Sequence, residues 1–184
     1  SIEALSDQGV CTILLVDPAT GTLRHGATST MPEDFCRAVD GAPVGPQVGS
    51  CGTAAYRKAA VIVTDIASDP LWAPWAEART LILSYGFKAC ASIPILDSRG
   101  EVLGTYAMYY KSARGPTRYE VKLLQVSSSL LGIALERRRD DEALRASEER
   151  VEAILDNSPL MVFLKDRAGR YLFTNQTFEQ RFRL

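Results

Sequence analysis

The sequence predicts an α+β fold that ends in a long helix. Short apolar runs that stop at glycine, proline or aspartate predict strands and hairpins up to about residue 111. Beyond them no helix breaker occurs between Thr117 and Pro159, so this stretch is predicted to form one helix of about 40 residues. The composition, with 46% hydrophobic and 23% charged residues, is that of a packed globular protein.

The first elements are predicted to be a hairpin followed by a short helix. Residues 10–17 (VCTILLVD) and 22–27 have the pattern of strands, and the intervening DPATG is typical of a turn. Pro32 is expected to begin a short helix that ends near Val39. The segment 40–49, rich in glycine and proline, is predicted to be an ordered but irregular loop.

A helix, a strand, a second helix and a hairpin are predicted next. Ser50 is expected to cap the helix CGTAAYRK, which leads into a strand at 61–64. Asp69 and Pro70 have the pattern of a helix start, and Gly86 that of a helix end. The last two strands of this part are predicted at 88–96 and 101–111, joined by a turn at 97–100.

The long helix is predicted to begin with a capping box, because Thr117 and Glu120 have the T-x-x-E spacing. Its residues up to about Leu135 are apolar enough to pack on the preceding domain. Apolar residues at heptad spacing then indicate either the stalk of a parallel homodimer, which the sequence favours, or a solvated charged helix. This seam consists of Leu123, Val126, Leu130, Ile133, Leu144, Val151 and Ile154, and it is interrupted by Arg137, Asp140 and Ser147.

Several motifs resemble those of a known family. The stretches GPQVGSCGTAAY (45–56) and VIVTDIASDPLW (61–72), with ACASIPI (89–95) and LGTYAMYY (103–110), resemble a bacterial GAF sensory domain. The subgroup is the one found in histidine kinases and cyclic-di-GMP enzymes. The later segments ALRASEERVEAILDNSP and FLKDRAGRYLFTNQTF, within 143–178, resemble the linker and first strands of a PAS domain.

The resemblance implies a six-stranded antiparallel sheet with helices on both faces. It also implies three parts: a GAF domain at 1–137, a helical signalling linker at 138–157 and the first part of a PAS domain at 158–184. In this subgroup a tryptophan commonly follows the cysteine of the ACxS motif. Ala91 stands there in this chain, which implies a larger or emptier ligand pocket.

We expect a ligand pocket beside the start of the helix after Gly49. A helix N-terminus presents unpaired N–H groups that can bind an anion or a carboxylate, although a tight turn with a capping serine is the simpler interpretation. Trp72, Trp75, Tyr106, Tyr109 and Tyr110 are expected in the core or in the pocket wall. The candidate ligand-binding residues are Ser50, Cys51, Gly52, Thr53, Trp72, Cys90, Ala91, Ser92, Pro94 and Tyr106.

No catalytic or metal-binding residues are predicted. The four cysteines include no C-x-x-C pair, and the single histidine, His25, leaves a metal or haem without a second ligand. No paired carboxylates, Ser/His/Asp set or phosphate-binding loop is recognisable in the sequence. The cysteines are expected to be inert buried thiols, with a redox role for Cys51 and Cys90 as an alternative.

The sequence therefore predicts a cytoplasmic sensory module that binds a small molecule or anion of unknown identity. The net charge of −1 argues against nucleic-acid binding, and no apolar stretch is long enough to span a membrane. The expected partners are a second copy of the chain and an output domain in the same protein, which is a histidine kinase, a diguanylate cyclase or a phosphodiesterase. A ligand-free dimerisation and spacer domain is the alternative.

Overall fold

A computed structural model describes residues 9–28 and 30–182. The described residues up to 136 form one compact unit, and those from 137 onward form a second. The first unit is built on a six-stranded sheet in the order β3-β2-β1-β6-β5-β4, in which every neighbouring pair is antiparallel. The strands are β1 (Val10–Val16), β2 (Thr22–Thr28), β3 (Ala42–Pro43), β4 (Val61–Val63), β5 (Ala89–Leu96) and β6 (Val102–Tyr110).

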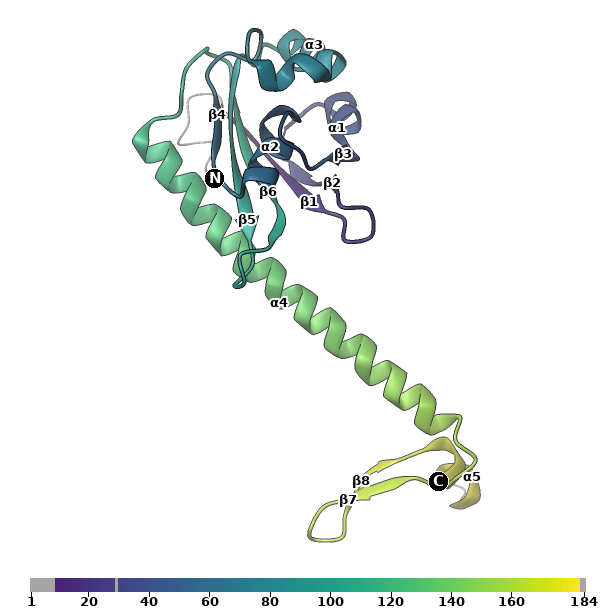
Figure 1. Cartoon of the computed structure of the whole chain (residues 1–184). Coiled ribbons are helices and arrows are strands. Elements are labelled where there is room, and N and C mark those ends of the chain that lie inside the picture. Colours follow the sequence, from purple (N-terminus) through teal and green to yellow (C-terminus); the bar gives the residue numbers. More distant parts are fainter. Residues whose placement is uncertain (1–8, 29, 183–184) are drawn as a thin grey trace. The chain divides into compact units, whose positions relative to one another are not determined.

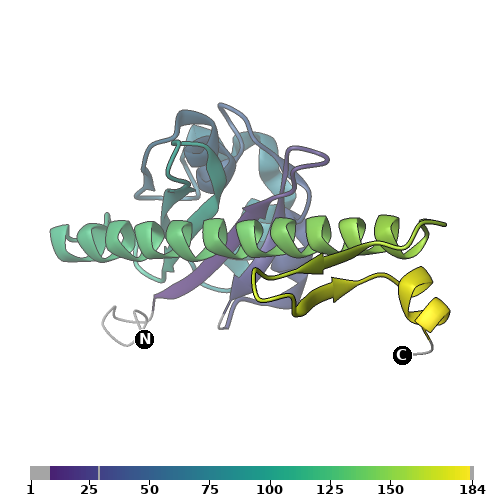
Figure 2. The same cartoon turned by 90° about the horizontal axis from the view of Figure 1, so that it is seen from below.

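Helices cover both faces of this sheet, as the resemblance implies (Figure 1). One face carries three α-helices and a 3-10 helix, and the first part of the long helix α4 runs across the other face (Figure 2). The helices are α1 (Glu33–Val39), α2 (Gly49–Arg57), the 3-10 helix η2 (Pro70–Trp75), α3 (Ala76–Ser84) and α4 (Arg118–Asp156).

Strand alternation divides the buried side chains of β5 and β6 between two hydrophobic clusters. Cys90 and Tyr109 face the cluster beneath α1, α2 and α3, whereas Ala91 and Tyr106 face the cluster beneath α4. The register agrees with this division, because Cys90 lies opposite Tyr109 in the β5–β6 ladder. Consecutive side chains of β5 therefore point to opposite faces of the sheet, as expected for a strand.

Helix α4 lies close to β5. Leu124, Ser128 and Gly132 are buried against the sheet, and Ser128 Oγ donates a hydrogen bond of 2.6 Å to the carbonyl of Pro94. A Cβ atom on Gly132 would lie 2.3 Å from the carbonyl oxygen of Leu96. Packing of the first part of the long helix on the domain is therefore confirmed, and a glycine permits the closest approach.

The start of α4 has the predicted capping box. The backbone N–H of Thr117 donates to the Glu120 carboxylate at 2.7 Å, and the Glu120 N–H donates to Thr117 Oγ1 at 3.2 Å. Both carboxylate oxygens also accept from Arg114, each at 2.8 Å. Glu120 is only 6% exposed, and these partners stabilise its charge in that environment.

This ion pair makes stability depend on pH. Hydrogen bonds from Arg114, with a smaller contribution from Thr117, lower the pKa of Glu120 from 4.5 to about 2. A carboxyl group whose pKa is lower in the folded state binds protons more readily when unfolded. The Glu120 carboxylate therefore stabilises the folded state fully above about pH 4.5, and this stabilisation is lost as the pH falls toward about 2.

The Glu120→Gln variant should therefore be less stable than the wild type at pH 7. Acidification should lower its free energy of unfolding by less than it lowers that of the wild type. The difference in the free energy of unfolding between the two proteins should shrink between pH 4.5 and pH 2. Each unit of pKa shift accounts for at most roughly 1.4 kcal/mol of this change. Thermal unfolding followed by circular dichroism measures both effects. Glu101→Gln, which changes an exposed carboxylate paired with Lys58, should behave like the wild type. Equal acid sensitivity of Glu120→Gln and the wild type would contradict the prediction.

Two local features differ from the sequence predictions. The loop after Val39 contains the short strand β3, which pairs with β2. The helix predicted from Asp69 to Gly86 is divided, because Pro74 lies in a 3-10 segment and the α-helix begins only at Ala76. A proline removes one backbone donor, which favours such a break.

The second unit contains the end of α4 and a small α/β segment. Its elements are β7 (Phe163–Lys165), β8 (Tyr171–Thr174) and α5 (Gln176–Phe182), and β7 and β8 pair in an antiparallel hairpin. Asn175 is completely buried. Its amide group donates to the carbonyls of Leu155 and Leu160, and its Oδ1 accepts from the N–H groups of Val162 and Phe178. One side chain thus connects α4, the following loop and α5.

Candidate functional site

A small cavity lies between the sheet and the helices α1, α2, η2 and α3. Its volume is about 30 Å³, whereas roughly 10–15 Å³ is enough to hold one water molecule. Ligand pockets for drug-sized molecules are about ten times larger. The residues that line it are Thr12, Leu14, Leu23, Phe35, Val39, Ala42, Val48, Gly49, Ser50, Cys51, Gly52, Trp72, Trp75, Ala78 and Tyr109.

A buried cluster of hydroxyl and thiol groups forms one end of the cavity. Ser50 Oγ accepts hydrogen bonds from Ser92 Oγ at 2.8 Å and from Cys90 Sγ at 3.2 Å. Cys51 Sγ lies 3.3 Å from Ser92 Oγ. All four residues are buried, so these bonds replace the water that the polar groups lose on folding.

Ser50 does not cap α2, contrary to the prediction. The helix begins one residue earlier, at Gly49, and Ser50 lies within its first turn. Gly49 has a φ of +50°, a conformation that glycine adopts without strain. The Ser50 hydroxyl therefore faces β5 and bonds to Cys90 and Ser92 instead of to the helix backbone.

Burial keeps both thiols of the cluster protonated at neutral pH. It raises the pKa of Cys51, although hydrogen bonds, first that of Ser92, act in the opposite direction. It raises the pKa of Cys90 to about 12, against a smaller lowering by the bond to Ser50. The thiolate is the reactive form of cysteine, so these surroundings disfavour a role as redox sensors.

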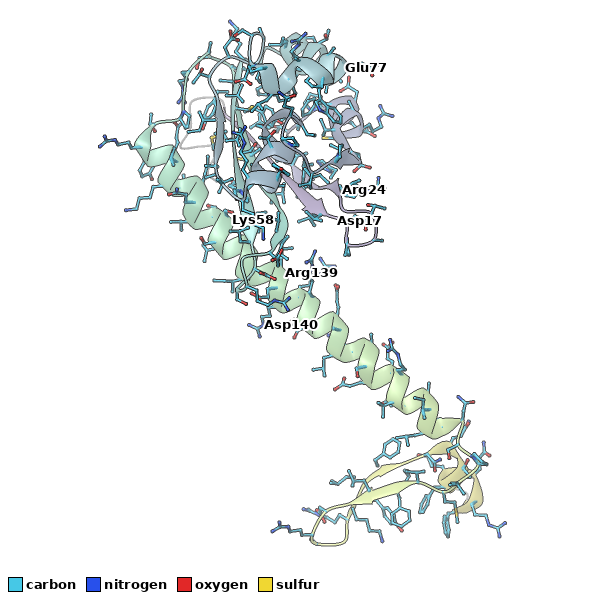
Figure 3. All side chains as sticks on the ribbon, viewed as in Figure 1. Asp17, Arg24, Lys58, Glu77, Arg139 and Asp140 are labelled. Carbon is cyan, nitrogen blue, oxygen red and sulfur yellow. The ribbon has the colours of Figure 1, made fainter. Side chains whose placement is uncertain are left out.

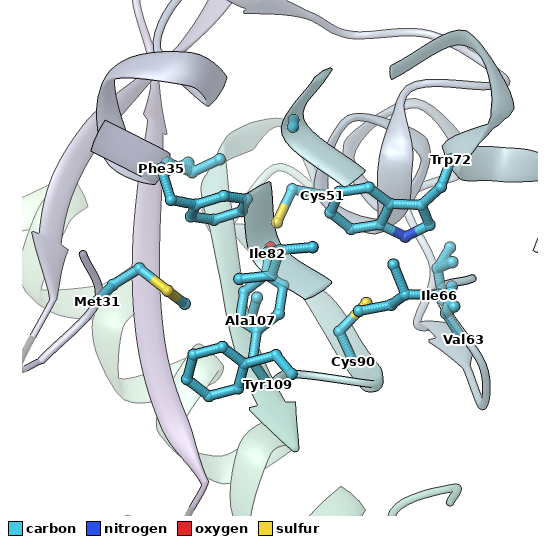
Figure 4. Close-up of a cluster of buried hydrophobic side chains, with 14 of the residues drawn as sticks. Met31, Phe35, Cys51, Val63, Ile66, Trp72, Ile82, Cys90, Ala107 and Tyr109 are labelled. Atoms are coloured by element: carbon cyan, nitrogen blue, oxygen red, sulfur yellow. The ribbon is translucent and has the colours of Figure 1, made fainter. Parts of the chain in front are cut away.

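Aromatic side chains form much of the cavity wall (Figure 4). Tyr109 packs edge-on against Phe35 and Phe87, with ring centroids 5.7 Å and 6.1 Å apart. Trp72 is 3% exposed, and its ring atoms lie 3.7 to 3.9 Å from the position of a Cβ on Gly49. The indole therefore covers the first residue of α2.

Four of the ten candidate ligand-binding residues line the cavity, namely Ser50, Cys51, Gly52 and Trp72. Cys90 and Ser92 lie behind this wall and bond to Ser50. Thr53 accepts a hydrogen bond from the Val48 N–H, and the Pro94 carbonyl accepts one from α4. These last two residues do not line the cavity.

The expectation that Ala91 and Tyr106 belong to the pocket wall is wrong. Both side chains are in the cluster that faces α4, on the opposite side of the sheet, because each is one residue out of phase with Cys90 or Tyr109. The small side chain of Ala91 therefore does not enlarge the pocket. It lies instead on the face covered by the long helix.

Sequence reasoning did not identify the part of the wall that comes from β1, β2, β3, α1, α3 and the residue before α2. Apart from Thr12 these residues are apolar, and none of them belongs to a motif that separates it from ordinary core residues. Strand alternation in 10–17 was the one usable signal, since it places Thr12 and Leu14 on one face. The missed wall residues are Thr12, Leu14, Leu23, Phe35, Val39, Ala42, Val48 and Ala78.

The described residues contain neither a metal-binding cluster nor a membrane-spanning helix. In residues 9–28 and 30–182, no group of three or more histidine, cysteine, aspartate or glutamate side chains is placed to hold a metal ion. His25 lies on β2 and is half-buried. Among the helices described, none is both long and apolar enough to cross a bilayer.

Comparison with known proteins identifies the family of this fold. The family model of the GAF domain matches residues 2–136, and that of the PAS domain matches residues 149–184. A methyl sulfide methyltransferase-associated sensor from Methanosarcina acetivorans is 33% identical over 173 residues, which are 94% of this chain and 17% of that protein. The chain thus spans only a small part of this relative.

Solved structures agree on the fold. A domain of a two-component sensor histidine kinase protein from Sinorhizobium meliloti superposes with a TM-score of 0.60 at 24% identity, covering 74% of this chain and 83% of that one. The GAF domain of a phosphoenolpyruvate-protein phosphotransferase from Coxiella burnetii superposes with a TM-score of 0.64 at 18% identity, covering 77% and 79%.

Proposed function

The chain belongs to the GAF domain family, and on that premise we propose that it is the ligand-sensing and dimerisation module of a larger signal-transduction protein. Occupancy of the cavity would change the packing of α4, which passes the change to an output domain. The likeness to a sensor supports this role. The output domain is proposed to be a histidine kinase or an enzyme of cyclic-di-GMP metabolism.

One observation carries the proposal: β5 is bonded to the cavity wall on one side and to α4 on the other. Ser92 donates to Ser50 in the cavity wall at 2.8 Å. Two residues further along β5, the Pro94 carbonyl accepts from Ser128 of α4 at 2.6 Å. A ligand that moves the start of α2 would therefore pull on the strand that holds α4.

A cavity this small fits a proposal in which the ligand displaces the cavity walls. Its volume of about 30 Å³ leaves room for about two or three atoms, so a molecule of even a few heavy atoms has to push the walls apart. Packed cores respond to such a change by discrete shifts more than by gradual deformation. The binding event would thus be coupled to repacking of α2 against β5.

Dimerisation is proposed to use the heptad seam of α4. Six of its seven residues are at least half exposed, so their apolar side chains largely face solvent in the single chain. Leu123, the seventh, is half-buried. A parallel homodimer would cover the seam and place two copies of any output domain side by side. The exposed residues are Val126, Leu130, Ile133, Leu144, Val151 and Ile154.

Glutamate at two seam positions should abolish this dimer. In Leu130→Glu with Ile133→Glu, like charges would meet across the seam, so sedimentation velocity should show a monomer where the wild type is a dimer. The melting temperature should change little beyond the loss of the dimer, because these side chains are 62% and 65% exposed. Gln125→Glu with Ser129→Glu adds the same charge off the seam. A dimer that survives the first pair, or is lost equally with the second, would count against the seam.

Signal transmission through the seam is tested by replacing its polar residues with apolar ones. Asp140 and Ser147 interrupt it, and both are exposed (Figure 3 labels Asp140). Replacing both by leucine in the protein that carries the output domain should strengthen the coiled coil and hold the output in one state. Glu142→Leu with Glu149→Leu, two positions further along, is the matched control. Output that still responds normally in the first variant would overturn transmission through the seam.

A ligand-free dimerisation and spacer domain is the second candidate, and the small size of the cavity favours it. In that case no small molecule would raise the melting temperature. A ligand at 100 times its Kd would instead add about 2.7 kcal/mol to the free energy of unfolding.

We also propose that the protein is located in the cytoplasm. All four cysteines are free thiols, as is usual for proteins of a reducing compartment.

A further inference from the structure

The cavity wall contains no charged side chain. Among the described residues that line it, none is aspartate, glutamate, lysine, arginine or histidine. Its polar side-chain groups are the hydroxyls of Thr12, Ser50 and Tyr109, the thiol of Cys51, and the indole N–H groups of Trp72 and Trp75, of which that of Trp72 is buried and has no hydrogen-bond partner among the residues described. These groups can hydrogen-bond to a neutral oxygen or sulfur atom, but they cannot neutralise an ion.

Burial of an ion here would be unfavourable. An ionised carboxylate or ammonium that leaves water without a partner charge loses far more hydration energy than a few hydroxyl groups restore. Burial already raises the pKa of Cys51, and it raises that of Tyr109 well above its ordinary value. The same surroundings that disfavour these anions would disfavour an anionic ligand.

The start of α2 does not compensate for this. The Trp72 ring lies over Gly49, so an apolar surface covers the first residue of the helix. The Gly52 N–H already donates to the Val48 carbonyl at 3.1 Å. The helix end therefore lacks the open, hydrated approach that anion sites at helix N-termini use.

We propose that the cavity binds a small uncharged molecule that is mostly apolar, of only a few heavy atoms, and that it excludes carboxylates, phosphates and ammonium ions. This inference rests on the proposed sensing function and names the ligand class for the same site. The size limit comes from the volume of about 30 Å³. The chemical limit comes from the uncharged lining and its few hydroxyl and thiol groups.

Acetone and acetate test the ligand class, because they have the same number of heavy atoms and nearly the same shape but differ in charge. Each is titrated into isotope-labelled protein at constant ionic strength and pH 7. The amide signals of Ser50 and Cys51 and the indole N–H signal of Trp72 are followed by NMR. Acetone should shift these signals in a saturable manner, and acetate should bind at least tenfold more weakly.

Two cavity-filling variants localise the binding. Ala78→Phe places a ring in the cavity from α3, and Val39→Phe does so from the half-buried edge of α1. The second keeps the test valid if the first does not fold. Either folded variant should lose the acetone response. Ala143→Phe, at an exposed position of α4, should keep it.

The outcomes separate the ligand class from the proposed function. Equal or tighter binding of acetate at these signals would overturn the ligand class and leave sensing intact. Absence of acetone binding, or acetone shifts that persist in both filled variants, would also overturn it. The proposed function fails separately, if the output does not respond to the leucine substitutions at Asp140 and Ser147.

Discussion

Replacing Gly132 by leucine should destabilise the first unit by roughly 3 kcal/mol or more, because the new side chain cannot fit between α4 and β5. A Cβ atom at this position would lie 2.3 Å from the carbonyl oxygen of Leu96, and a backbone atom cannot move aside as a flexible side chain can. Overpacking of well-packed cores typically costs 1–3 kcal/mol, and here α4 must also shift.

The direction of this effect is informative because helix propensity predicts the opposite. Leucine is a much better helix former than glycine, by most of ~1 kcal/mol, so an exposed glycine in a helix would be improved by the change. Urea unfolding monitored by circular dichroism gives the free energy of unfolding. Ala134→Leu, at an exposed position two residues further along, should change it little. Unchanged stability of Gly132→Leu would show that the helix does not lie this close to the sheet.

In the second unit, Asn175→Ala should cause the largest loss of structure. The side chain is completely buried and makes four hydrogen bonds, to the carbonyls of Leu155 and Leu160 and from the N–H groups of Val162 and Phe178. Removing it leaves buried polar groups unpaired, at about 1–3 kcal/mol for each group that water cannot reach. Backbone hydrogen exchange across residues 158–182 should therefore accelerate strongly.

A matched control distinguishes this role from a general effect of losing an asparagine. Asn157 is exposed and makes one side-chain hydrogen bond, to the carbonyl of Ala153. Asn157→Ala should leave hydrogen exchange in 158–182 nearly unchanged, and exchange in residues 10–110 should be the same in both variants. If Asn175→Ala exchanged no faster than Asn157→Ala, the bonds of Asn175 would not hold the segment together.

The role of Cys51 follows from its surroundings more than from its motif. The sequence favours an inert buried thiol at Cys51, and a reactive thiol is the alternative because a helix N-terminus can lower the pKa of a cysteine. In the folded chain, burial dominates and raises the pKa of Cys51, and the Ser92 hydroxyl lies beside the sulfur. The partial charge of a helix end is weak compared with the loss of water around a buried thiolate.

The sequence by itself determined most of the secondary structure and the family. The capping box at Thr117 and Glu120, the turn at 97–100 and the uninterrupted helix that follows are local signals, because capping, turn formation and helix propagation involve residues a few positions apart. Alternation along β5 is a local signal as well, because consecutive residues such as Cys90 and Ala91 of a strand point to opposite faces. The GAF and PAS motifs then identified the sheet that these elements form.

Only the tertiary structure decided where the cavity lies and which residues wall it. The sequence around Ala91 and Tyr106 does not indicate which face of the sheet α4 covers. Strand alternation groups the residues that share a face, but it does not tell which of the two faces lines the cavity. The same holds for Phe35 and Ala78, whose helices reach the cavity from distant parts of the chain. Periodicity records which side chains share a face, whereas the identity of that face depends on packing between elements far apart in sequence.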